Sequence, residues 1–325
     1  MVNFLKRRRG FIKGEKGEFV ATGVPKKFNK TYTDSIVKYL NCLDLLFEKS
    51  QQKSEFEFIF TLLRFRGIQY TKEDPYENSL ETFDAIMKLG NKIHGDPKIN
   101  LFLWLYGHIV ESSEPYEILA NLLNICNGGR YQAYNFPRIR TKWGYRDQFP
   151  TEKIQKLEVL ANKASMINVL EPIKDVFDKD LRNSIFHSDY SVFNGEIIIN
   201  NPQKIYSAKV TQSLINKALA YHEVVKNLIR SYREGYKESK LIKVSPGFSP
   251  DPDEKAVLII RENDGAIGMK DSWTKEEIKN GKISFFAGHI FSDEQKYLDQ
   301  GVVVLPSRKQ GVLKRIINTF FRKET

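Results

Sequence analysis

The chain has 325 residues, of which 41% are hydrophobic and 12% aromatic, and its net charge is +11. This composition suffices for one or two packed cores and excludes a wholly disordered chain. The two cysteines exclude a disulfide framework, and the longest nearly apolar run, residues 101–110, is too short to cross a membrane. Because the N-terminus also lacks a signal-peptide pattern, we expect a protein of the reducing cytoplasm.

The positive charge is concentrated at the two ends of the chain. Residues 1–30 carry nine Lys and Arg against two Glu, and residues 308–325 carry six against one, so the ends hold +7 and +5 and the middle holds −1. Basic ends favour a polyanion such as RNA, or an anionic membrane surface. The alternative is a pair of solvated tails that keep the protein soluble.

Helical periodicity dominates residues 31–235 and predicts a mainly α fold. Thr33 and Thr151 are expected to cap two of the helices. The segment 101–111 is apolar nearly all round, which predicts a buried helix. The predicted helices span 33–49, 56–66, 76–93, 101–111, 113 to the Gly128-Gly129 pair, 151 onward, 175–188 and 209–232.

Strands are predicted at three places outside these helices. Asn194-Gly195 between residues 191–193 and 196–199 predicts a β-hairpin, because this pair tolerates the positive φ angles of a type I′ turn. Residues 1–30 form a basic N-terminal arm with a short hairpin through 11–19. After a linker rich in Pro and Gly, residues 240–307 form a small α+β region with strands at 256–261 and 283–291 around a helix near 275–279. Residues 308–325 form a basic amphipathic helix.

The helix predicted at 175–188 carries Arg182, Asn183 and His187 near its C-terminal end. Asn183 and His187 lie about 40° apart around a helix and share a face, whereas Arg182 lies about 140° from His187. One straight helix therefore does not aim Arg and His at one atom. Two antiparallel copies across a two-fold axis would do so. The buried stripe of this helix is expected to be Phe177, Leu181 and Ile185.

The run Arg-Asn-x-x-x-His-Ser-Asp-Tyr at 182–190, followed by a hairpin and one long helix, resembles the signature of the HEPN family (higher eukaryotes and prokaryotes nucleotide-binding). The resemblance covers roughly residues 31–235. It implies a helical domain that dimerises around a composite site. It also implies a metal-independent ribonuclease of the kind found in toxin–antitoxin and antiviral defence systems, with no cofactor.

In such a site the proton of a ribose 2′-OH would pass to His187, because the pKa of histidine lies near neutrality. Arg182 would bind the phosphate, and Asn183 would orient the imidazole or the phosphate. The product would be a 2′,3′-cyclic phosphate. The structural alternative pairs Arg182 with Asp178 and leaves His187 closing a helix C-terminus. Supporting roles are expected for His108, Glu111, Asp189 and Tyr190, although a His on an apolar helix is more often a core residue.

The segment 129–146 interleaves cations with aromatic rings, as a surface for single-stranded RNA requires. The RNA-binding candidates are Arg130, Arg138, Arg140, Lys142, Trp143 and Arg146, beside the aromatic residues Tyr131, Tyr134, Phe136 and Tyr145. The alternative is an ordered loop whose rings fill the core. The expected partners are RNA, a second copy of the chain and an antitoxin or regulatory protein. A non-catalytic RNA- or nucleotide-binding dimerisation module is the second interpretation, and membrane contact by the C-terminal helix is less favoured.

Overall fold

The computed structural model describes residues 29–64 and 75–236, the strands at 11–13, 19–21, 240–243, 255–260 and 267–270, and Ser245. Within these residues the protein is mainly helical, as predicted. The chain divides into two compact units, one made of Met1–Arg64 with Asp74–Tyr232 and the other of Phe65–Glu73 with Arg233–Thr325.

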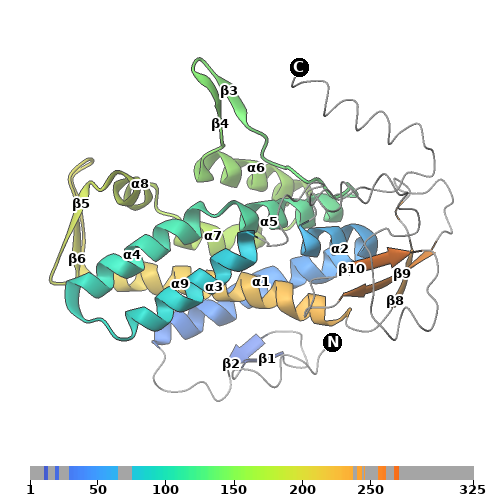
Figure 1. Cartoon of the computed structure of the whole chain (residues 1–325), viewed down its shortest axis with the longest axis horizontal. Coiled ribbons are helices and arrows are strands. Elements are labelled where there is room, and N and C mark those ends of the chain that lie inside the picture. The colour runs from blue at the N-terminus through green and yellow to red at the C-terminus, as the bar shows by residue number, and fades with distance from the viewer. Residues whose placement is uncertain are drawn as a thin grey trace, which may run out of the picture. The chain divides into compact units, whose positions relative to one another are not determined.

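The helices of the first unit run largely alongside one another (Figure 1). They are α1 (Lys30–Lys53), α2 (Glu55–Leu63), α3 (Pro75–Gly90), α4 (Gly95–Glu111), α5 (Ser113–Cys126), α6 (Pro150–Lys163), the short 3₁₀ helix η2 (Ile167–Leu170), α7 (Glu171–Val176), α8 (Lys179–His187) and α9 (Ala208–Glu234). Its strands are β1 (Phe11–Lys13), β2 (Phe19–Ala21), β3 (Ile139–Thr141), β4 (Gly144–Arg146), β5 (Tyr190–Phe193), β6 (Glu196–Ile199) and β7 (Lys204–Tyr206). No helix in the described part of the chain is both long and apolar enough to span a membrane.

Helix α5 is largely buried and packs against α1, α2 and α6. All of its residues from Pro115 to Leu123 are buried. Two of these are polar, and both bind the backbone of the segment that follows. Glu117 accepts from the amides of Asn135 and Phe136, and Asn121 exchanges two hydrogen bonds with Gln132. Such pairing lets a helix with polar residues lie in the core.

The helix that was predicted to be buried at 101–111 is buried only in part. Most of the C-terminal half of α4 is buried, but Trp104 is 59% exposed and His108 is also exposed. The neighbours of α4 include α3, α8 and β5, and they leave one side of the helix open. The expectation that His108 is a core residue is therefore also wrong.

The predicted hairpin is confirmed as β5 and β6. Asn194 and Gly195 have φ angles of 48° and 82°, and Phe193 pairs with Glu196 across the turn. The Asp96 carboxylate at the start of α4 accepts from both turn amides, at 3.0 Å and 2.9 Å. Strand β7, which was not predicted, extends the hairpin to a three-stranded antiparallel sheet.

The prediction of one helix over 175–188 is wrong, because the chain breaks between α7 and α8. Phe177 and Asp178 adopt extended backbone, each with a ψ angle of 114°. Phe177 therefore leaves the predicted stripe, and Leu181 and Ile185 alone remain in it as fully buried and nearly fully buried residues. Arg182, Asn183 and His187 still share one helix, which ends at His187.

Two predicted caps are also wrong. Helix α1 begins before Thr33, and the side chain of Asn29 caps it by accepting from the amide of Thr31 at 2.8 Å. Helix α6 begins at Pro150 rather than after Thr151. Glu152 reaches back to accept from the amide of Phe149 at 2.7 Å, which satisfies a free donor at the helix start.

The second unit contains an antiparallel sheet in the order β10-β9-β8, made of β8 (Lys240–Lys243), β9 (Lys255–Ile260) and β10 (Ile267–Lys270). The strand predicted at 256–261 is confirmed as β9. In the N-terminal arm, β1 and β2 pair Lys13 with Phe19, as expected for a hairpin there. The linker, the strand at 283–291 and the helices near 275–279 and at 308–325 lie outside the described residues. The second helix ends at Leu63 rather than near Arg66, because Arg64 adopts a left-handed backbone with a φ angle of 52°.

Candidate active site

The first turn of α8 is fixed by side chains from distant parts of the chain. The Asp178 carboxylate caps the helix by accepting from the amide of Leu181, and it also accepts from the Tyr206 hydroxyl at 2.8 Å. The Tyr106 hydroxyl fills the break before α8, donating to the Val176 carbonyl and accepting from the Asp178 amide at 3.1 Å. Burial raises the pKa of Tyr106, so its hydroxyl stays protonated and able to donate.

Helix α8 approaches α4 closely at a glycine. A Cβ on Gly107 would lie 3.1 Å from Cγ2 of Ile185, which is tighter than ordinary van der Waals contact. The missing side chain therefore lets α8 rest on α4 through its buried residues Leu181 and Ile185. This close packing brings the last residue of α4, Glu111, to the side chain of Arg182.

The guanidinium of Arg182 is held by Glu111 and Asn183. Nε donates to Oε2 of Glu111 at 2.7 Å, Nη2 lies 2.5 Å from the same oxygen, and Nη1 donates to the Asn183 side-chain oxygen at 2.9 Å. The expected alternative pairing of Arg182 with Asp178 is therefore wrong. A guanidinium has five N–H groups, and the contacts described here use three of them. Two N–H groups remain for a further acceptor.

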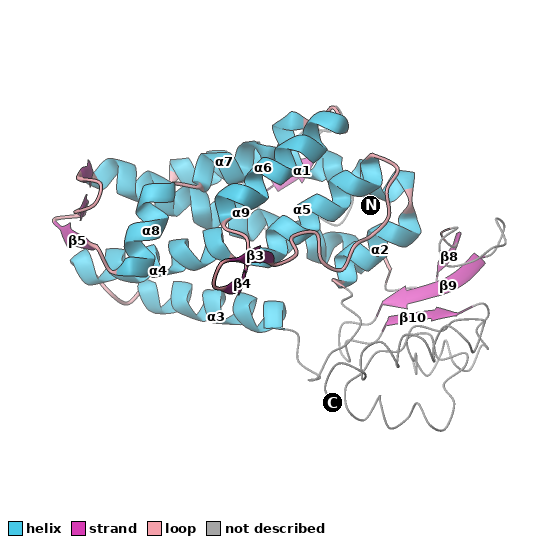
Figure 2. Cartoon of the chain, turned by 90° about the horizontal axis from the view of Figure 1, so that it is seen from above, coloured by secondary structure: helices cyan, strands magenta, loops and turns pink. Residues whose placement is uncertain are grey.

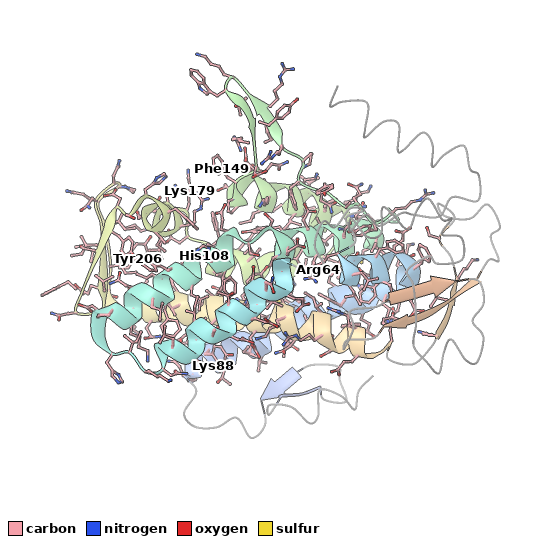
Figure 3. All side chains as sticks on the ribbon, viewed as in Figure 1. Arg64, Lys88, His108, Phe149, Lys179 and Tyr206 are labelled. Carbon is pink, nitrogen blue, oxygen red and sulfur yellow. The ribbon has the colours of Figure 1, made fainter. Side chains whose placement is uncertain are left out.

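Two aromatic rings lie against the same guanidinium. The Arg182 carbon Cζ lies 5.1 Å from the ring centroid of Phe186 and 5.9 Å from that of Phe149, and the Arg146 Cζ lies 4.4 Å from the Phe149 ring. Figure 3 shows Phe149 and His108 around this site, with Lys179 at the start of α8. The Arg182 side chain is only 15% exposed, and the two rings and Glu111 hold its guanidinium in a fixed position.

His187 stands at the other end of α8 and is exposed. The helix ends there because Ser188 adopts a left-handed conformation with φ of 53°, and its amide closes on the Ile185 carbonyl. Among the described residues, the imidazole of His187 makes no hydrogen bond or ion pair. A single chain therefore does not bring His187 into contact with Arg182. This agrees with the helix geometry, which predicted that the two side chains point in different directions.

The open side of α4 continues the surface around the motif. His108 meets the Phe186 ring edge-on at 5.8 Å, and Phe186 is itself 42% exposed. Trp104 lies one turn before His108 on α4, and it lowers the pKa of Tyr190 against the larger rise caused by burial. We call Trp104, His108 and Phe186 the exposed strip. The sequence analysis did not identify Trp104 or Phe186 as site residues. The available signal was helical spacing, because Trp104 lies four residues before His108 and Phe186 lies four residues after Arg182.

The remaining expected supporting residues lie just after α8. The amide of Asp189 donates to the Ser184 carbonyl at 2.9 Å, and its carboxylate accepts from the Asn200 side chain at 2.9 Å. Asp189 thus fixes the exit of the helix to the sheet. Tyr190 begins β5, a strand that packs against α4.

A buried lysine that the sequence did not single out lies close to Glu111. The ammonium of Lys153 donates to the Ser113 hydroxyl at 2.8 Å and lies 5.3 Å from the ring centroid of Tyr116. Burial lowers the pKa of Lys153, and the nearby carboxylates of Glu111 and Glu117 oppose this effect. Its positive charge therefore lies near the ion pair of Glu111 and Arg182.

The predicted RNA-binding residues divide into two groups. Arg146 forms two hydrogen bonds with Glu152, at 2.6 Å and 2.8 Å, and Arg138 donates to Asp147 at 2.9 Å. These two arginines are therefore already paired with carboxylates. Arg140, Lys142, Trp143 and Arg130 are exposed, and none of them forms an ion pair in the described part of the chain.

The aromatic residues of this segment divide in the same way. Phe136 is buried, and Tyr131 lies against Phe60 with ring centroids 5.9 Å apart, so these two rings fill the core. Trp143 is 87% exposed and Tyr145 is 67% exposed. They belong to the hairpin of β3 and β4, which projects from the helices in Figure 1 and stands over them in Figure 2.

Within the described ranges, no three His, Cys, Asp or Glu residues are grouped so that they could hold a metal ion. Comparison of the chain with family models, with curated proteins and with solved structures finds no match.

Proposed function

We propose that the protein is a metal-independent endoribonuclease of the HEPN type, acting as a two-fold dimer in a toxin or antiviral defence system. The observation that carries this proposal is the placement of Arg182. Its guanidinium is fixed by Glu111 with two N–H groups to spare, on the same short helix as the exposed imidazole of His187.

The chemistry follows from these two groups. A neutral imidazole of His187 removes the proton of a ribose 2′-OH, and the 2′-oxygen attacks the adjacent phosphorus. The two remaining N–H groups of Arg182 donate to the phosphate oxygens, where negative charge builds in the transition state. His187 of the second protomer protonates the 5′-oxygen as it leaves. The products are a 2′,3′-cyclic phosphate and a 5′-hydroxyl, and DNA is not cleaved because it lacks the 2′-OH.

The dimer supplies what one chain lacks. Arg182 and His187 point about 140° apart around α8, so a second copy of the helix has to present the missing partner. The exposed strip of Trp104, His108 and Phe186 lies beside the motif and would be covered in such a dimer. Exposed rings next to a polar site are typical of protein interfaces.

One observation favours the second interpretation, a non-catalytic RNA- or nucleotide-binding dimer. The charge of Arg182 is already compensated by Glu111, which weakens its ability to stabilise the negative charge that builds on the phosphate in the transition state. The two interpretations differ in one outcome. The binding module retains RNA without shortening it, whereas the nuclease shortens it.

The test is incubation of the full chain with total RNA in EDTA, followed by analysis of the fragment ends. The nuclease interpretation predicts cleavage that EDTA does not reduce and fragments ending in cyclic phosphate. Bound but intact RNA would support the binding module instead.

A further inference from the structure

The hairpin of β3 and β4 is built differently at its base and at its tip. At the base, Arg146 is paired with Glu152 through both of its terminal nitrogens, and Arg138 is paired with Asp147. Arg146 and the Phe149 amide lower the pKa of Glu152 to about 2. This carboxylate is therefore ionised at any physiological pH, and the base stays anchored to α6.

At the tip, by contrast, the cations form no ion pair within the described residues, and the aromatic rings are exposed to solvent. Arg140 lies directly opposite Tyr145 in the hairpin register, so both side chains leave the same face. Lys142 and Trp143 form the turn, with the Lys142 ammonium 5.0 Å from the Trp143 ring centroid. The turn is closed by Thr141, whose hydroxyl accepts from the Trp143 amide at 3.2 Å and donates to the Gly144 carbonyl.

The composition of the tip selects one kind of partner. No acidic residue occurs between Arg138 and Arg146, so the surface attracts anions. The exposed rings of the tip are Trp and Tyr, whose faces stack on any unpaired base. No exposed aliphatic residue or Phe accompanies them between Arg138 and Arg146, where the one aliphatic residue, Ile139, is half-buried. Alternating cations and rings match the alternation of phosphate and base along a single strand.

We propose that this hairpin is a docking finger for single-stranded RNA, in which Trp143 and Tyr145 stack on bases and Arg140 and Lys142 bind phosphates. The inference rests on the proposed function for its choice of RNA as the physiological strand. The finger is connected to the motif through its base, because the Phe149 ring contacts both Arg146 and Arg182. A strand held by the tip is thus delivered to the side of the molecule where Arg182 lies.

The test measures binding in the full-length His187→Ala protein, so that the RNA stays intact. The probe is a fluorescein-labelled oligouridylate of about twelve nucleotides, followed by fluorescence anisotropy over a range of salt concentrations. We expect Trp143→Ala to weaken binding about 5- to 150-fold, which corresponds to one base no longer stacked. We expect Arg140→Gln with Lys142→Gln to reduce the salt slope by about 0.7 for each phosphate that the protein no longer binds.

Two matched controls remove equivalent groups elsewhere. Phe193→Ala deletes an aromatic residue that is 63% exposed on the other hairpin, and Lys163→Gln with Lys209→Gln deletes two exposed cations. Both controls are expected to bind like the parent. Because Trp143 is 87% exposed, its substitution should leave the melting temperature unchanged.

Other probes separate the possible partners. Oligodeoxyuridylate of the same length should bind nearly as well, since stacking does not use the 2′-OH, whereas duplex RNA should bind more weakly. Unchanged binding in Trp143→Ala would overturn the inference. Trp143-dependent binding to phosphatidylserine vesicles in preference to RNA would also overturn it.

The outcome is independent of the cleavage test. If the wild-type chain cleaves RNA in EDTA while Trp143→Ala binds normally, the finger is wrong and the proposed nuclease stands. If Trp143-dependent binding is found without any cleavage, the finger stands and the nuclease is wrong.

Discussion

The Glu111 carboxylate reaches Arg182 across 71 residues of sequence and binds Nε and Nη2 with a single oxygen, Oε2. This contact depends on the closeness of α4 and α8 at Gly107. It fixes the direction of the guanidinium while leaving two N–H groups unused. We therefore regard Glu111 as a positioning residue for Arg182.

Glu111→Gln should lower the cleavage rate more than it changes RNA binding. The amide keeps a hydrogen bond to Arg182 but loses the charge that fixes the guanidinium, and a small misplacement costs about 10- to 100-fold in kcat. Binding should be unchanged or tighter, because a negative charge near the phosphate is removed. Single-turnover cleavage and anisotropy measure the two effects separately. Glu158→Gln removes a carboxylate from the surface pair with Lys174 and serves as the control, with no expected effect on either quantity.

Substitution in the exposed strip should dissociate the dimer. Trp104→Glu places a charge on a side chain that is 59% exposed, so the fold should survive while the two-fold interface and cleavage are both abolished. Sedimentation velocity at micromolar concentration measures the change. Phe193→Glu, at a comparably exposed position on the β5–β6 hairpin, should remain dimeric. A wild-type chain that sediments only as a monomer would contradict the composite site.

Removal of the basic ends should weaken RNA binding and flatten its salt dependence. Residues 1–27 and 308–325 carry net charges of +6 and +5, which together equal the net charge of +11 of the whole chain. Each phosphate contact contributes about 0.7 to the slope of log K against log salt for single strands. Titration of the truncated and full-length His187→Ala proteins at several salt concentrations tests this expectation. An identical slope would show that the ends do not bind RNA.

His222 on α9 should make the protein less stable in mild acid. Burial lowers the pKa of His222 to about 4, and Lys226 adds to this effect, while Glu223 and Asp84 oppose it. The unfolded chain takes up a proton near pH 6.5 and the folded chain only near pH 4, so the free energy of unfolding falls as the pH drops between these values. The full effect is about 3 kcal/mol.

Urea denaturation of wild-type and His222→Phe proteins between pH 7 and pH 4 measures this contribution as a difference in pH slope. The variant should lose less stability than the wild type over the range. His94→Gln, which removes an exposed histidine, should retain the wild-type slope. Parallel wild-type and His222→Phe curves would show that His222 is accessible to protons in the folded state.

The parts of the fold that were predicted correctly depend on local chemistry. The Asn194-Gly195 turn was found because those two residues favour positive φ angles wherever they occur. The helices were found from their apolar spacing, with errors at their ends. The break at Phe177 and Asp178 was missed because the Tyr106 and Tyr206 hydroxyls that support it come from distant segments.

Burial was harder to predict than helicity. The 101–111 helix has the more continuous apolar run, yet α5 is the more deeply buried, because Glu117 and Asn121 bind the backbone that passes over them. The same limit applies to the site. The spacing of His108 and Glu111 identified both as candidates, but only the packing of α4 on α8 decides that Glu111 binds Arg182 while His108 faces Phe186.

The central claim is that His187 and Arg182 cleave RNA without a metal ion. The most direct measurement compares wild-type, His187→Ala and Arg182→Ala proteins on total RNA in EDTA, with end-group analysis and melting temperatures for each. We expect the wild type to give cyclic-phosphate ends, and His187→Ala to cleave about 10²–10⁴-fold more slowly with its melting temperature nearly unchanged, since the side chain is exposed. Arg182→Ala should lose a comparable amount. Cleavage by His187→Ala at the wild-type rate would contradict the account.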